Sequence, residues 1–436
     1  MWYFIYRFFK VILKYILPKR GLSKIIESYN YHKRRKKRKI KYVRLFIFLI
    51  ILVAVIWRIG LAFFDKSDKS SNNDANVGDG STSETSAFED TTIHLTAIGD
   101  IMCHGPNYKA AYIPSSDSYD FSPFFKNISE YTSKADLTIG NLETTFAGKD
   151  RGYSGYPTFN SPAELGQAIK DIGVDVLGTA NNHCMDKGYS GLSSTLDVLD
   201  ELEFSHMGTS RSVEEQSSIL VRNVNGINIA FLAFTYGTNG ISIPKDKSFS
   251  VNLIDRDLIV KQIESAKRLN VDMICVNMHW GVEYQTSPNS EQKELADFLF
   301  KNGVDIIFGS HPHVLQPMEK RTVSLDDGST KDGFVIYSLG NFISNQSDVN
   351  TQDTIILNLQ VTKSGKDGNI SIDSFDYIPV YCYNKGNNAK NRYELIDLKK
   401  SISDYENGTS SISPSLYNTF KSELQRIEKI MNSNLN

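Results

Sequence analysis

The chain has 436 residues, of which 40% are hydrophobic and 22% are charged, and its formal net charge is -2. This length fits a single large α/β domain with appended segments as well as it fits two domains. The four cysteines are widely spaced and form no CxxC pair, which argues against a zinc knuckle and against a dense disulfide framework. We expect them to be small buried thiols.

Positive charge is concentrated at the start of the chain. Residues 1–44 hold fifteen of the 48 Lys and Arg but only one acidic residue, Glu27, so the rest of the chain is net acidic. A basic head on an acidic body is expected when the head meets anionic lipid, and we predict no nucleic-acid partner. Residues 1–17 interleave aromatic and basic side chains, which indicates an amphipathic helix on the inner leaflet or a second, poorly formed anchor.

One apolar run is long enough to cross a membrane. Residues 45–64 read LFIFLIILVAVIWRIGLAFF, and Arg58 stands near the outer end, where it can snorkel to the interface. The basic run at 32–44 directly precedes this predicted transmembrane helix, so the N-terminus is expected in the cytoplasm and the body outside the cell membrane. Because no small-residue cleavage site stands out, a retained single-pass anchor is favoured over a removed signal peptide.

A polar tether is predicted to separate the anchor from the body. Residues 65–91 are rich in Ser, Asn, Asp and Gly and have few residues able to form a core. The body is expected to span residues 92–400, followed by a helical tail at 401–436.

Within the body, apolar runs alternate with segments of helical periodicity, which predicts βαβ units and a largely parallel sheet. The expected strands lie at 93–99, 136–140, 174–178, 271–278 and 304–309, and expected helices lie at 161–173 and 289–303. Asn225-Gly226 predicts a β-hairpin within residues 218–234, and a second hairpin is expected within residues 354–380.

Polar side chains follow the predicted strands at the points where the strands end. They are Asp100, Asn141 with Glu143, Asn182 with His183, His279, and His311 with His313. Sites in open α/β sheets form at the carboxyl ends of strands, so these segments would deliver their ligands to one place. Any one of these motifs alone is more often a histidine or amide that satisfies a buried backbone group. Taken together, they favour a site for two divalent ions.

The residue types suggest different roles within such a site. Glu143 could bridge two cations through its two oxygens, and Asn182 offers a neutral oxygen ligand. His183, next to it, could act as an acid or orient a substrate. His311 and His313 flank Pro312, whose restricted φ helps to hold both imidazoles in place.

The ordered motifs GDIMCHG, GNLETTF, ANNHCMDKG, MHWGVEY, GSHPHVLQP and YSLGNFI, over about residues 92 to 345, resemble the CapA family, which is associated with poly-γ-glutamate capsules. The resemblance implies an α/β (α+β) fold similar to calcineurin-like metallophosphoesterases. That fold is a four-layer sandwich, here preceded by one transmembrane helix, with a two-metal centre at one edge.

The resemblance also implies roles for particular residues. The implied metal ligands are Asp100, His104, Glu143, Asn182, His279, His311 and His313, for two divalent ions (Mn, Fe or Zn). His183 and Glu283 would be catalytic, and Trp280 and Asn341 would line the substrate side, with core packing an equal alternative for Trp280. Three positions depart from the phosphoesterase pattern. His104 stands four residues after Asp100 instead of two, Glu143 replaces an aspartate, and Asn181 replaces a glycine.

Three functions remain open at this point. The first is a membrane-anchored, metal-dependent hydrolase or transferase that acts on an anionic cell-surface polymer. The second is a non-catalytic component of a membrane polymer synthesis or export assembly, in contact with the membrane subunits of a polymer synthase. The third is a surface phosphodiesterase that uses the same residues.

Overall fold

The computed structural model describes residues 89–433, except for Asn388 and Lys390. The predicted basic segment, the predicted transmembrane helix and nearly all of the predicted tether lie outside the described residues. Within the described part of the chain, no helix is both long enough and apolar enough to span a membrane.

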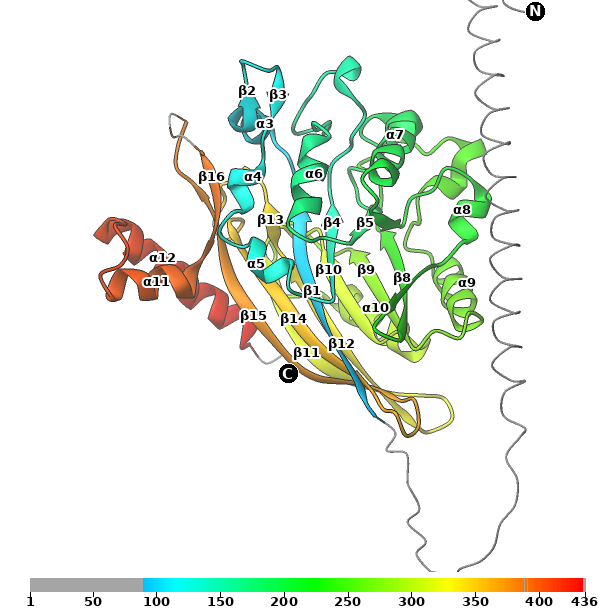
Figure 1. Cartoon of the computed structure of the whole chain (residues 1–436). Coiled ribbons are helices and arrows are strands. Elements are labelled where there is room, and N and C mark those ends of the chain that lie inside the picture. The colour runs from blue at the N-terminus through cyan, green and yellow to red at the C-terminus, as the bar shows by residue number, and fades with distance from the viewer. Residues whose placement is uncertain (1–88, 388, 390, 434–436) are drawn as a thin grey trace, which may run out of the picture. The chain divides into compact units, whose positions relative to one another are not determined.

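Two β-sheets form the centre of the body (Figure 1). The first has the order β16-β15-β14-β1-β4-β5-β6, with β13 paired to β1. Its strands are β1 Thr91–Ile101, β4 Leu137–Leu142, β5 Val176–Gly178, β6 Ser205–Met207, β13 Asn341–Ile343, β14 Asp353–Lys363, β15 Ile370–Asn384 and β16 Tyr393–Asp397. The second has the order β11-β12-β10-β9-β8-β7. Its strands are β7 Leu220–Val224, β8 Ile227–Thr235, β9 Met273–His279, β10 Ile306–Ser310, β11 Leu315–Ser324 and β12 Thr330–Leu339.

Helices cover the outer faces of both sheets. The first sheet carries α3 Gly105–Ala111, α4 Ser122–Phe125, α5 Ser129–Thr132, α6 Glu164–Asp171 and α7 Gly188–Glu201, and a short hairpin of β2 Tyr112–Ile113 and β3 Ser118–Tyr119 lies near α3. The second sheet carries α9 Arg256–Lys267 and α10 Ser290–Lys301, with the short α8 Val213–Ser217 beside them. The 3-10 turns are η1 Lys149–Arg151 and η2 Lys245–Ser250.

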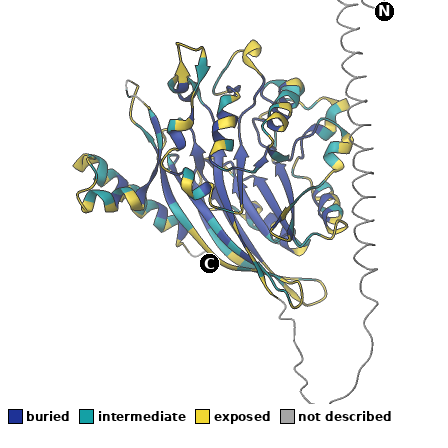
Figure 2. Ribbon diagram, viewed as in Figure 1, coloured by how far each residue is buried: buried dark blue, intermediate teal, exposed yellow. Residues whose placement is uncertain are grey.

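The alternation of side chains along each strand builds three apolar layers. In β8, Ile229 and Phe231 point into the core between the sheets, whereas Ala230 and Leu232 pack under α9 and α10. The central strands are therefore buried on both faces, while much of β15, the second half of β11 and the outer sides of the helices are exposed or half-buried (Figure 2). This arrangement is the four-layer α/β/β/α sandwich that the family resemblance implied.

The expected strands and both expected hairpins are present. The first hairpin is β7 and β8, whose turn residues Asn225 and Gly226 have φ of 49° and 94°, as a two-residue hairpin turn requires. The second is β14 and β15. The largely parallel sheet was expected as a whole, but parallel pairing covers only part of each sheet. Antiparallel strands are added at one edge of the first sheet, whose other edge ends in the parallel strand β6, and at both edges of the second.

The C-terminal helices belong to the body. α11 Leu398–Glu406 begins before the expected boundary at residue 400, and α12 Pro414–Met431 follows it. Phe420 and Ile427 of α12 are buried in the core cluster that contains residues of both sheets. The free cysteines are all buried, as expected for small apolar thiols.

The parallel centres of the two sheets end at the same edge of the molecule. Asp100 pairs in register with Asn141, and His279 pairs in register with Ser310. Gly99 permits the close approach of β1 to the segment that leads into β13, since a Cβ at this position would lie 2.0 Å from the Gly340 oxygen. The fold therefore gathers the predicted strand-end residues at one edge.

Candidate metal centre

Two buried carboxylates lie at the centre of this edge. Asp100, at the end of β1, accepts hydrogen bonds from Asn141 Nδ2 at 2.8 Å and from the His311 backbone N–H at 3.2 Å. Glu143, just after β4, is fully buried, and neither of its oxygens has a hydrogen-bond partner. Burial, together with the nearby charges of Asp100, Glu283 and Asp186, raises the pKa of Glu143 well above its usual value. A bound cation would favour the charged form of this carboxylate, so Glu143 fits the role of a metal ligand.

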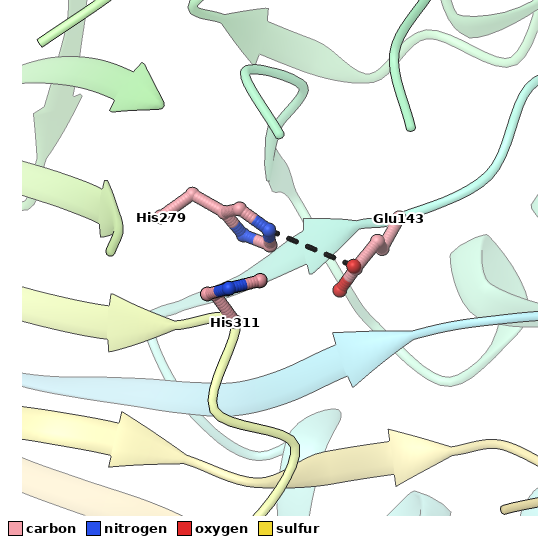
Figure 3. Close-up of side chains that lie close together, drawn as sticks. All are labelled: Glu143, His279 and His311. Atoms are coloured by element: carbon pink, nitrogen blue, oxygen red, sulfur yellow. Dashed lines mark ion pairs between the residues drawn. The ribbon is translucent and has the colours of Figure 1, made fainter. Parts of the chain in front are cut away.

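Three histidines face these carboxylates. His279 ends β9, and His311 and His313 follow β10 directly. His279 Nε2 lies 3.6 Å from Glu143 Oε1, and the His279 and His311 rings are 4.8 Å apart (Figure 3). His313 Nε2 lies 3.9 Å from the same Glu143 oxygen.

Two of these histidines, His279 and His311, are kept neutral by burial and by neighbouring groups. Burial and the other histidines lower the pKa of His279 well below its usual value and that of His311 to about 3, so their lone pairs are available. The Ser310 hydroxyl, which donates to the Met278 carbonyl, can accept from His279 Nδ1–H at 2.9 Å. This tautomer leaves His279 Nε2 as the ligand atom.

The donors form three overlapping groups, each compact enough to hold one ion. They are Asp100 with Glu143 and His313, Glu143 with His279 and His311, and Glu283 with His311 and His313. Glu143 belongs to the first two groups, as expected of a bridging ligand.

Asn182 extends the group formed by Glu143, His279 and His311. Its Oδ1 lies 2.9 Å from His279 Nε2. Two ligands that bind one ion at about 2.1 Å and at right angles to each other lie about 3 Å apart, so this spacing suits a shared cation.

The residues present therefore fit divalent ions. The buried polar atoms without a partner include both Glu143 oxygens, His311 Nδ1 and Asn141 Oδ1, all gathered at this edge. Each would cost free energy if it were left unpaired, and a cation would satisfy several at once. Mixed imidazole, carboxylate and amide donors suit Mn, Fe or Zn.

Beside the ligands lies a His–Asp pair. His183 Nδ1 is 2.8 Å from Asp186 Oδ2, and both side chains are almost completely buried. The His183 ring packs edge-on against Phe159 at 4.6 Å. Because Asp186 can accept a hydrogen bond from His183 Nδ1–H, Nε2 is the ring atom left for proton transfer.

A model of the family described as bacterial capsule synthesis protein PGA_cap matches residues 94–346. The chain belongs to this family. The resemblance to CapA proteins that the motifs carried is thereby confirmed.

Individual PGA_cap relatives and solved structures are similar to the chain. The capsule biosynthesis protein CapA of Bacillus anthracis is 31% identical over 285 residues, which cover 64% of this chain and 66% of that protein, just under two thirds of its length. The PGA biosynthesis protein CapA of Bacillus subtilis is 29% identical over 293 residues, which cover 66% of this chain and 73% of that protein.

Among solved structures, the calcineurin-like phosphoesterase YfkN from Bacillus subtilis aligns with 78% of this chain and 98% of its own, at 13% identity and a TM-score of 0.39. A novel phosphatase from Mycoplasma pneumoniae aligns with 67% of this chain and 95% of its own, at 16% identity and a TM-score of 0.40.

Four predicted site residues of this PGA_cap protein are not among the buried metal donors of the described chain. They are His104, Glu283, Trp280 and Asn341. His104 belongs to none of the three donor groups in the described chain, and its Nδ1 accepts from the Asn345 backbone N–H at 3.2 Å. Glu283 is exposed and reaches only the group of His311 and His313. Trp280 is 2% exposed and stacks on Tyr337 in the core under the helices, not on a substrate face. Its core-packing alternative is therefore the observed one.

Asn341 was expected to contact substrate, but the structure places it behind a ligand. It is fully buried, and its Nδ2 donates to Gln346 Oε1 and to the Thr351 carbonyl. Its Oδ1 lies 3.0 Å from His313 Nδ1. Asn341 therefore aims His313 Nε2 toward Glu143, as a residue supporting a metal ligand does.

Two residues next to the ligands were missed by sequence reasoning. Tyr236 follows β8, and its ring lies 4.5 Å from that of His311. Asn239 accepts from Asn182 Nδ2 at 3.2 Å through its Oδ1, and its own Nδ2 lies 3.4 Å from His183 Nε2. The signal was the polar YGTNG that ends an apolar strand, but it contains no histidine or carboxylate.

The segment that presents the two histidines is strained. His311 and His313 have φ of 97° and 59°, which a side chain with a Cβ adopts at a cost of about 1 kcal/mol or more per residue. We therefore expect His311→Gly to be more stable than His311→Ala by about 1 kcal/mol, although both variants lose the same ligand.

Urea unfolding of the metal-free proteins measures this difference. The control is the same pair of substitutions at His94, an exposed residue within β1 whose φ is not positive. There the order should reverse, because glycine weakens a strand. Equal stability of the two His311 variants would contradict a strained backbone.

Proposed function

We propose that this chain is a membrane-anchored, extracytoplasmic, metal-dependent hydrolase or transferase that acts on an anionic cell-surface polymer during capsule biosynthesis. Its membership of the PGA_cap family supports the capsule context. The Bacillus subtilis relative is a PGA biosynthesis protein by name, which points to poly-γ-glutamate as the polymer.

One observation carries the catalytic part of the proposal. Glu143 is a buried carboxylate without any hydrogen-bond partner, and it is shared by two groups of metal donors. A purely structural carboxylate at this depth would be expected to have partners, because an isolated buried charge is costly. A site for two ions would need both Glu143 oxygens free of other hydrogen bonds, so that they could bind the cations.

The chain's own residues would divide the remaining work. When bound, two divalent ions supply Lewis acidity and a nucleophile at neutral pH. His183, aligned by Asp186, would protonate the departing group through Nε2. Asn341 and Ser310 hold the ligand histidines in the required tautomers.

The surroundings of the site bear on how substrate reaches it. The half-exposed rings of Tyr236 and Tyr284 lie beside His311 and His313, and Glu283 is exposed next to them. An acidic residue at this position repels a polyanion, so the affinity for an anionic substrate would depend on the bound cations.

The anchoring part of the proposal rests on the sequence. Residues 45–64 would cross the membrane, and the basic residues before them would bind anionic lipid. The partners proposed on this basis are membrane lipid, the anionic polymer and membrane subunits of a polymer synthase, with no nucleic acid.

The test is metal content and hydrolysis by the full chain purified in detergent. We expect about two divalent ions per chain. We also expect cleavage of poly-γ-glutamate, and both should be lost in the double variant His311→Ala with His313→Ala. The control is His94→Ala, which removes an exposed histidine from the same domain.

Each other outcome selects an alternative. Bound metal without cleavage of any offered polymer would favour the non-catalytic assembly role. Cleavage of bis(p-nitrophenyl) phosphate but not of polyglutamate would favour the surface phosphodiesterase. No bound metal under replete conditions would overturn the site assignment itself.

A further inference from the structure

Far from the histidines in sequence, β7 forms an edge of the second sheet. It pairs with β8 and with no other strand of the described chain. In an antiparallel pair, alternate backbone N–H and C=O groups point away from the partner strand. Along Leu220–Val224 these groups have no other recorded partner in the described chain, and β7 contains no proline that would block pairing.

Both sides of this edge are hollowed. A cavity of about 340 Å³ lies on the side of β6, and an open groove of about 650 Å³ lies on the side of α9. Ile219 and Val221 border both hollows, and both are only half-buried. α8 and α9 lie at this end of the second sheet, beyond β8 (Figure 1).

The cavity on the β6 side has a wall of mixed polar and apolar side chains that carries little charge. Gln216, Asn252 and Gln262 form a network in which Gln216 Nε2 donates to Asn252 Oδ1 at 3.1 Å. The buried Ser210 also lines it. The one acidic lining residue, Glu215, is paired with Arg211. Small uncharged side chains such as threonine, which has both a methyl and a hydroxyl group, suit this mixed wall.

The groove on the α9 side is lined by three apolar side chains, by Ser217, Ser218 and Ser265, and by one cation. Ile219, Val221 and the exposed Leu269 line it together with Arg268. Arg268 donates to Ser265 Oγ at 2.7 Å, and it makes no ion pair with any described carboxylate. This wall suits apolar side chains and one acidic group.

An extended polypeptide matches both walls at once. Successive side chains of a strand point to opposite faces, so a strand added to β7 would place alternate side chains in the cavity and in the groove. Backbone hydrogen bonds supply affinity in this recognition mode, and the alternate pockets supply specificity.

We propose that β7 binds an extended segment of a partner protein as an added strand, with small polar side chains toward the β6 side and apolar side chains plus one acidic residue toward Arg268. A second copy of this chain is a poorer match, because its β7, Leu220–Val224, has no acidic residue to offer Arg268. The inference does not depend on the metal centre.

The test uses the full chain in detergent and a fluorescein-labelled peptide of alternating Thr and Val with Glu at the central Val position. A matched peptide carries Lys in place of Glu. We expect fluorescence anisotropy to show at least about tenfold tighter binding of the Glu peptide, because a charge mismatch at an interface is costly. Arg268→Glu should reverse the preference, and Lys261→Glu, the same charge change elsewhere on α9, should leave it intact.

A second variant tests the edge itself. Ile219→Lys should abolish binding of both peptides, while circular dichroism and metal content stay those of the wild type. Equal affinity for the two peptides, or a preference that Arg268→Glu leaves unchanged, would overturn the proposal. So would sedimentation of the full chain as a dimer that Ile219→Lys dissociates, because a second copy would then occupy the edge.

Discussion

Replacing Glu143 with Gln is expected to reduce the metal content from about two divalent ions per chain to one or none. Glutamine keeps the size of the side chain, but it removes the negative charge and one of the two equivalent oxygens. Since Glu143 is shared by two donor groups, both sites should weaken, each by about 100-fold or more in affinity. Inductively coupled plasma mass spectrometry and metal titration measure this loss, and hydrolysis should fall with it.

In the metal-free protein, the same substitution should increase the stability against unfolding. The pKa of Glu143 is raised in the folded state, so the folded chain holds this proton at pH values at which the unfolded chain has lost it. The stability of the metal-free wild type should therefore decline as pH rises above about 4.5, until the raised pKa is passed. Glu143→Gln should remove that part of the decline and be the more stable protein at pH 8.

This reversal of sign separates a metal ligand from a structural residue. Substitution of a structural carboxylate would destabilise the protein with and without metal. Glu143→Gln, by contrast, should stabilise the protein only when metal is absent. Glu201→Gln, on the exposed end of α7, is the matched control and should change neither quantity. Two retained ions in Glu143→Gln would refute the bridging assignment.

Much of the candidate metal centre could be predicted because its donor residues follow strands. Asp100, Glu143, His279, His311 and His313 each stand at or just beyond the end of a strand, and parallel strands deliver such residues to one edge. Apolar runs that alternate with helical segments were enough to place those strands. Strand boundaries were less accurate, as for β5, which is shorter than expected.

The substrate-side expectations for Trp280 and Asn341 depended on side-chain direction, and for Trp280 the core-packing alternative is the one observed. Trp280 follows His279 by one residue, and alternation places neighbouring side chains on opposite sides, so His279 faces the site and Trp280 faces the helical layer. Asn341 stands at the correct edge, but it is one layer behind His313. Residue type and order along the chain do not reveal such a difference in depth.

Other features depend on contacts that are distant in sequence. Asn239 reaches Asn182 and His183 across 57 and 56 positions in the chain. The unpaired edge of β7 could not be predicted from the sequence either. An edge strand whose two faces are half-buried has a sequence pattern similar to that of a strand paired on both sides. The strained φ values of His311 and His313 arise from the path that the chain must follow between β10 and β11.

Replacing His183 with Gln should separate metal binding from catalysis. His183 is in none of the three donor groups of the described chain, so both ions should be retained. Loss of the proton donor should lower the turnover number by about 10²-fold to 10⁴-fold, the usual range for a general acid. The measurement compares metal content and the rate of polymer cleavage in the same preparation.

Asp186→Asn is the informative companion variant, because it leaves His183 in place but removes the carboxylate that accepts its Nδ1 proton. We expect metal retention and a smaller loss of turnover than in His183→Gln, since the imidazole stays in place but loses the partner that orients it. Loss of metal in His183→Gln would instead make His183 a ligand. Full activity with both ions present would remove it from the reaction, and the departing group would then have to take its proton from water.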